Sequence, residues 1–149
     1  MDYVRIECDG RDYTEKLRSY GTHSVLFLNI KSYAGGTRPW NTKGGSKGGF
    51  RPQDMNDGLM EVVAIDNLDL AILHAGGSGN SVCQCRKAVI TTTKPVPMQV
   101  DGEPCLKEAC VITISQDQTV APTAKMLVRN KTATCKTCTV LKLIVVFFY

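Results

Sequence analysis

Apolar residues recur along this chain in short runs of strand length rather than with a helical period. Residues 3–8 (YVRIEC) alternate and lead into Asp9-Gly10, a pair typical of a hairpin turn. Residues 24–30 (SVLFLNI) are continuously apolar, which indicates a strand buried on both faces. Similar runs, rich in β-branched residues, predict strands over residues 59–65, 86–93, 96–100, 110–114 and 125–128.

Residues 67–77 are the one segment that predicts a helix, with Asn67 as its cap and Gly76-Gly77 at its end. The turn signals come at short spacings. The predicted fold is therefore mainly β, a sandwich or barrel-like antiparallel domain with one short helix. Residues 33–58 contain seven glycines and two prolines, too many for a core element, and loops this long in compact domains commonly carry function.

Composition narrows the class of protein only a little. The 149 residues, 43% of them hydrophobic, suffice for one domain with a core. The net charge of +4 is compatible with phosphate ligands or an anionic membrane, and no basic stripe indicates a nucleic-acid partner. Seven cysteines and a polar N-terminus favour a reduced, intracellular protein. The apolar end, residues 141–149, is too short to span a bilayer and is either a buried strand or a non-native end.

The cysteines and glycines carry weak signals. Neither glycine-rich stretch completes a phosphate-binding or dinucleotide-binding motif. Cys83 and Cys85 would share one face of a strand, and Cys135-x-x-Cys138 has the spacing of metal ligands. No histidine stands near either pair, so buried packing is favoured over a zinc site.

Two of the Asp-Gly pairs are followed by a further acid. Asp57 precedes Glu61, and Asp101 precedes Glu103 in the stretch VPMQVDGEP. Each pair alone indicates a β-turn. On an extended backbone, however, Asp101 and Glu103 would point to the same side and repel unless a cation, a basic group or a shared proton relieved them. That pattern suits a general base or a metal-linked acid.

Four stretches together resemble the accessory domain of eukaryotic diacylglycerol kinases, most closely the ankyrin-repeat branch with the zeta, iota and retinal-degeneration-A types. They are VLFLNIKSYAGGTRPW (25–40), NDGLMEVVAI (56–65), QCRKAVITTTKPVPMQVDGEPC (84–105) and KMLVRNK (125–131). The similarity covers about residues 3–131. These residues are therefore expected to form the accessory domain, with residues 132–149 as an atypical C-terminal tail.

The resemblance implies ATP-dependent phosphorylation of diacylglycerol to phosphatidic acid in lipid signalling, with Mg²⁺. The chain would supply the β-rich half of a cleft whose N-terminal catalytic domain, with its nucleotide loop, is absent, so the isolated chain is expected to be an inactive fragment. In the wider superfamily an Asp-Gly-Glu motif supplies the general base, which implies Glu103 as base and Asp101 as its partner.

The same resemblance implies metal-linked roles for Asp57 and Glu61. Tyr33, Gly35, Gly36 and Trp40 would lie in a loop facing the substrate or the partner domain, and packing of Trp40 on the sandwich is the alternative. The expected location is cytoplasmic, with peripheral membrane association. A different class of function stays open, namely a non-catalytic regulatory module that binds a membrane or a partner.

Overall fold

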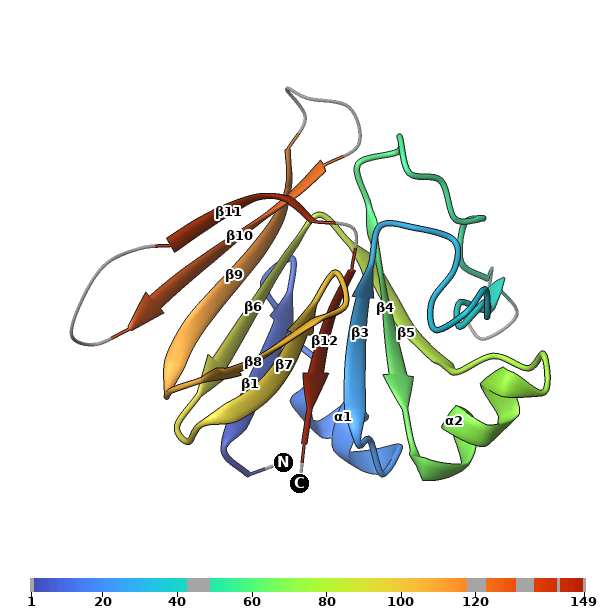
Figure 1. The fold of residues 1–149 in the computed structure, drawn as a ribbon, viewed down its shortest axis with the longest axis horizontal. Coiled ribbons are helices and arrows are strands. Elements are labelled where there is room, and N and C mark those ends of the chain that lie inside the picture. Colours follow the sequence, from blue (N-terminus) through green and yellow to red (C-terminus); the bar gives the residue numbers. More distant parts are fainter. Residues whose placement is uncertain (1, 43–48, 118–122, 131–135, 142, 149) are drawn as a thin grey trace.

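In the part of the chain that the structure describes, the strands form two six-stranded sheets that pack against each other (Figure 1). A computed structural model of the chain describes residues 2–42, 49–117, 123–130, 136–141 and 143–148. All strand pairs in this part are antiparallel, and neither sheet closes into a barrel. The expected mainly β, antiparallel fold is therefore confirmed in its sandwich form.

Sheet A has the strand order β11-β10-β9-β6-β1-β2, and sheet B has the order β5-β4-β3-β12-β7-β8. The strands of sheet A are β1 (Val4–Cys8), β2 (Arg11–Asp12), β6 (Lys87–Thr92), β9 (Cys110–Asp117), β10 (Thr123–Asn130) and β11 (Lys136–Leu141). The strands of sheet B are β3 (Ser24–Leu28), β4 (Met60–Ile65), β5 (Asn80–Cys85), β7 (Val96–Val100), β8 (Glu103–Lys107) and β12 (Leu143–Phe147).

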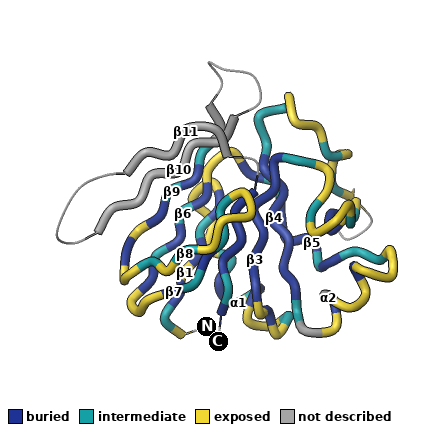
Figure 2. The backbone as a smooth tube through the Cα atoms, viewed as in Figure 1, coloured by how far each residue is buried: buried dark blue, intermediate teal, exposed yellow. Residues whose placement is uncertain are grey.

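Strands β3 and β4 of sheet B are buried on both faces, which explains why they are apolar at nearly every position (Figure 2). Alternate residues point to opposite faces of a strand. Val25 and Phe27 accordingly join the core between the two sheets. Leu26 and Leu28 join a second cluster on the outer face of sheet B. The prediction of a doubly buried strand at residues 24–30 is confirmed.

Described residues of the long glycine-rich segment pack on that outer face. Trp40 is 9% exposed in the second cluster and lies 4.8 Å from Phe50, measured between ring centroids. Its indole N–H donates to the carbonyl of Arg51 at 3.4 Å. The segment therefore acts as a cover over sheet B, although it contains no strand or helix of its own in the described part.

Among the described residues two short helices complete the fold, where one was expected. Helix α2 (Asn67–His74) lies where the sequence predicts it, but its N-cap is Asp66, which forms a capping box with Asp69. Helix α1 (Thr14–Ser19) was not predicted, because six residues are too few to show a helical period. No helix in the described part of the chain is both long and apolar enough to cross a membrane.

Strand β12 occupies the middle of sheet B. It pairs with β3 on one side, from Leu143↔Leu28 to Phe147↔Ser24, and with β7 on the other. Val145 and Val146 are fully buried. Of the two readings of the apolar end, the buried strand is the one the structure shows, while the division of the chain at residues 131 and 132 stays a prediction.

Candidate functional site

An open pocket lies at the end of sheet B where strands β3, β12 and β7 neighbour one another. Its volume is about 760 Å³, within the range of roughly 300–1,000 Å³ common for ligand sites. Its lining comes from the segment after β3, the end of β7, the turn that follows β7 and the start of β12. The lining residues are Ile30, Ser32, Tyr33, Ala34, Gly35, Gly36, Gln99, Asp101, Gly102 and Leu143.

One wall of the pocket is a tight hairpin loop. Tyr33 and Thr37 exchange backbone hydrogen bonds of 3.0 and 2.9 Å. Ala34, Gly35 and Gly36 between them have φ values of 43°, 78° and 98°. This left-handed backbone favours glycine, and a Cβ built at Gly35 or Gly36 would meet nothing within 4 Å. The glycines are thus required by the backbone conformation and leave an exposed, low-bulk rim.

The facing wall is the two-residue turn between β7 and β8. Asp101 and Gly102 have φ values of 47° and 95°, and Val100 pairs with Glu103, as in a type I′ hairpin. The Asp101 carboxylate accepts the N–H of Leu143 at 2.8 Å, and the Asp101 N–H donates to the Leu143 carbonyl at 3.0 Å. Asp101 therefore fixes the start of β12 at the floor of the pocket.

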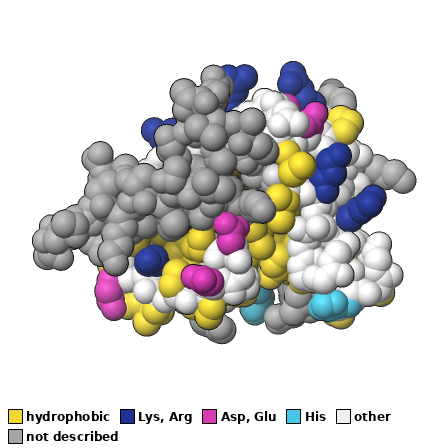
Figure 3. All heavy atoms as spheres, turned by 45° about the horizontal axis from the view of Figure 1, so that its top comes forward, with side chains coloured by type: hydrophobic (Ala, Val, Ile, Leu, Met, Phe, Trp, Pro, Cys, Tyr) yellow, Lys and Arg dark blue, Asp and Glu magenta, His cyan; other side chains and the backbone are white. Residues whose placement is uncertain are grey.

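This turn corrects one step of the sequence reasoning. Asp101 is in the left-handed region, so Asp101 and Glu103 do not lie two apart on one extended strand as that step assumed. Glu103 begins β8 and is exposed, and it is not among the pocket-lining residues. On the face shown in Figure 3, acidic side chains lie beside a band of hydrophobic ones. A base role for Glu103 with Asp101 as its partner stays a prediction.

Glu61 is a buried carboxyl group on the outer face of sheet B. It is 1% exposed and accepts hydrogen bonds from the side-chain amides of Gln53 at 2.9 Å and Gln84 at 3.1 Å. Burial raises the pKa of Glu61 to about 7, while the two amides lower it and the charge of Asp57 raises it further. Gln53 also donates to the carbonyl of Ile30 at 2.7 Å. This bond connects Glu61 to the pocket rim.

These contacts decide how well Asp57 and Glu61 fit Mg²⁺. Both oxygens of Glu61 face amide N–H donors, so Glu61 does not suit a direct metal ligand in this arrangement. Asp57 is half-buried, and one of its oxygens accepts the N–H of Leu59 at 2.9 Å. Their metal-linked roles stay predictions.

The structure brings some predicted site residues together and separates others. Tyr33, Gly35, Gly36 and Asp101 share the pocket, whereas Trp40 packs on sheet B as in the alternative reading. Sequence reasoning missed Gln53 and Gln84. The only local signal was that Gln84 is a polar residue between two buried cysteines. It also missed Leu143, because the position of β12 cannot be read from local sequence.

The fold and the pocket together define a β-sandwich domain with an open site at the end of one sheet. Residues 1–104 match the family model of the diacylglycerol kinase accessory domain. This region includes the Tyr33–Gly36 loop, Asp101 and Glu103. The chain belongs to the diacylglycerol kinase accessory domain family.

Several diacylglycerol kinases are similar in sequence to most of this chain. The eye-specific diacylglycerol kinase of Drosophila melanogaster is 54% identical over 112 residues, which cover 75% of this chain and 7% of that protein. Human diacylglycerol kinase zeta is 43% identical over 113 residues, which cover 76% of this chain and 12% of that protein. Human diacylglycerol kinase iota is 42% identical over 113 residues, which cover 76% of this chain and 11% of that protein. The chain thus spans a small part of these relatives. No solved structure matches it.

Proposed function

We propose that the chain supplies the β-rich half of a diacylglycerol kinase active site, in an enzyme that transfers a phosphoryl group from ATP to diacylglycerol. The observation that carries the proposal is the pocket itself, because it joins the Tyr33–Gly36 loop and the Asp101–Gly102 turn, about 65 residues apart in sequence. The family resemblance implies a role at the site for both segments. ATP and Mg²⁺ would be cofactors of the longer enzyme, which would include an N-terminal catalytic domain.

The pocket residues suit the positioning that phosphoryl transfer requires. The attacking hydroxyl of diacylglycerol must lose its proton, and the protein mainly orients groups and balances charge. Glu103 is exposed beside the pocket and would accept this proton. Asp101 is held by the Leu143 N–H and would orient the hydroxyl or a water molecule. The exposed glycine rim would admit the glycerol end of the lipid or the surface of the catalytic domain.

A chimeric enzyme tests this proposal. The present chain would replace the matching segment of the Drosophila eye-specific enzyme, and phosphatidic acid formation from diacylglycerol and ATP would be measured. We expect activity in the chimera and a loss of about 100-fold or more in kcat for Glu103→Gln, the contribution typical of a general base.

The matched control is Glu108→Gln, since Glu108 is exposed just after the other end of β8 and outside the pocket lining. It should leave kcat unchanged. A folded, active chimera that tolerates Glu103→Gln and Asp101→Asn would refute the assignment of these residues. A folded but inactive chimera would argue against the proposed half-site.

A second candidate is a regulatory module at a cytoplasmic membrane surface, and helix α2 favours it. Leu68 and Ile72, four residues apart on one helix face, are 73% and 48% exposed. Replacing both by Ser should lower binding to anionic vesicles several-fold. Leu106→Ser, at a 66% exposed site on β8, is the control. Equal binding of all three proteins in vesicle sedimentation would count against this function.

A further inference from the structure

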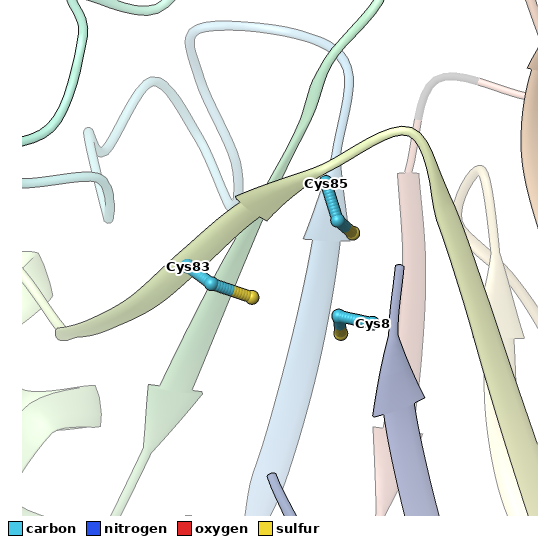
Figure 4. A group of neighbouring side chains, drawn as sticks. All are labelled: Cys8, Cys83 and Cys85. Carbon is cyan, nitrogen blue, oxygen red and sulfur yellow. The ribbon is translucent and has the colours of Figure 1, made fainter. Parts of the chain in front are cut away.

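Three cysteines from two sheets meet in the core, away from the pocket. Cys8 ends β1 in sheet A, and Cys83 and Cys85 lie on β5 in sheet B. Their sulfur atoms all lie within 4.8 Å of one another, and Figure 4 shows the side chains directed into a common space between the strands. The residues are 3%, 6% and 1% exposed. The cluster is therefore sealed from bulk solvent.

The backbone around the cluster is held by contacts that do not involve sulfur. Asp9, directly after Cys8, accepts the N–H groups of Arg86 and Lys87 at 2.9–3.1 Å. Its own N–H donates to the Lys87 carbonyl at 2.9 Å. The chain that follows Cys8 is thus fixed to the chain that follows Cys85. Such preorganisation is what a ligand set needs in order to bind without rearrangement.

A positive charge lies next to the cluster. The ammonium group of Lys16 donates to the carbonyl of Val82, the residue before Cys83, at 2.9 Å. Three thiolates would carry a net charge of −1 with a divalent ion, which this ammonium offsets, and −2 with a monovalent ion, of which it offsets one unit. Burial of an ionic group is tolerated when its charge is balanced in this way.

We propose that Cys8, Cys83 and Cys85 form a three-thiolate site for a soft d¹⁰ metal ion, Zn²⁺ or Cu⁺. Soft thiolate ligands select these metals. With metal–sulfur bonds of about 2.3 Å, three sulfurs around one ion lie about 4 Å apart, which is compatible with three sulfurs that all lie within 4.8 Å of one another. In the described part of the chain, no fourth cysteine, histidine or carboxylate joins the group. Cu⁺ would accept three ligands, whereas Zn²⁺ would complete its shell with a small exogenous ligand.

Metal titration of the 149-residue chain tests the proposal. Cys135 and Cys138 would first be replaced by Ser, so that this pair cannot contribute ligands. The reduced, anaerobic protein would be titrated separately with Zn²⁺ and with Cu⁺ against a chromophoric chelator. We expect one equivalent of at least one metal to bind. X-ray absorption at the edge of the bound metal should show three sulfur neighbours at about 2.3 Å.

Single substitutions locate the site. Cys83→Ser should weaken binding by about 100-fold or more, since it removes a direct ligand. Cys110→Ser is the matched control, because Cys110 is also buried, at 5% exposure, and bonds Thr92 outside the cluster. The metal should raise the Tm of the control protein and leave that of Cys83→Ala unchanged.

Several results would overturn the inference. Failure of the protein to take either metal from the chelator would do so, as would unchanged binding in Cys83→Ser. If the Cys83 variants do not fold, the sulfur count in the parent protein still decides, and fewer than three sulfur neighbours would refute the three-thiolate site.

Discussion

At the scale of single residues, Glu61 shows two opposing effects on one carboxyl group. Removal from water disfavours its charged form, while the two amide donors favour that form. The amide of Gln84 is fixed in orientation, because its oxygen accepts the Arg51 N–H at 3.0 Å and its nitrogen donates to the Arg51 carbonyl at 3.2 Å. Gln84 therefore ties the covering loop to β5 and faces Glu61 with a donor. Burial is the larger effect, and the pKa rises to about 7.

This shift predicts a pH dependence of stability. Below the ordinary pKa of 4.5 the group is protonated in both states. As the pH rises from there to about 7, the unfolded chain ionises while the folded protein keeps its proton. The free energy of unfolding should therefore fall across this window, by up to about 3 kcal/mol. Urea unfolding at a series of pH values measures the decrease.

Glu61→Gln should remove most of this slope, since an amide does not ionise. At low pH it should also lower stability, because its N–H₂ would face the donors of Gln53 or Gln84. Glu108→Gln, at an exposed position, should leave the fall of the free energy of unfolding with pH as it is in the original protein. An unchanged slope in Glu61→Gln would show that Glu61 is not the titrating group.

At the scale of elements, the junction between β5 and β6 takes the chain from sheet B to sheet A within one residue, Arg86. Asp9 holds this junction through its carboxylate while its own φ is 49°. Asp9→Ala should lower the free energy of unfolding by about 1–2 kcal/mol, because it loses the acceptor and strains a left-handed backbone. Asp9→Asn should cost less, since asparagine tolerates that region and keeps one oxygen. Equal stability of the alanine variant in denaturant unfolding would contradict this role.

The sequence predicts those elements whose own pattern is sufficient. Strand β7 runs over Val96–Val100, the residues predicted, and β3 and β4 agree with their apolar runs to within two residues. Strand β8, with the pattern EPCLK, lacks a clear alternation and was missed. The turns at Asp9-Gly10 and Asp101-Gly102 were predictable, because a two-residue hairpin turn needs left-handed backbone at both positions and the pair Asp-Gly favours it.

The candidate site was less predictable, because its parts meet only through long-range pairing. The resemblance pointed to Asp101 and to the loop at Tyr33, but the sequence alone does not show that Leu143 joins them. Cys8 likewise gives no sign of its partners, which lie about 75 residues further along the chain. Such neighbours depend on which strands are adjacent, and this is a property of the whole sheet rather than of a local pattern.

At the scale of the whole molecule, β12 joins the two halves of sheet B, since β3 and β7 contact each other only through it in the strand order. A chain that ends at residue 141 should therefore lose its cooperative unfolding transition and expose apolar surface. Removal of Tyr149 alone is the control and should leave the transition in place. Circular dichroism and dye binding during thermal unfolding would measure both. A shortened chain that unfolds cooperatively near the Tm of the control would show that sheet B does not depend on β12.

The central place of β12 in sheet B also bears on how the protein is made. During synthesis β3 emerges more than 100 residues before Leu143, so this edge of β3 stays unpaired until β12 has left the ribosome. Until then, two apolar strand edges stay open to other nascent chains, and pairing over such a sequence distance is slow. We therefore expect sheet B to close only after β12 has emerged, and to benefit until then from chaperones that hold unfinished β-sheets.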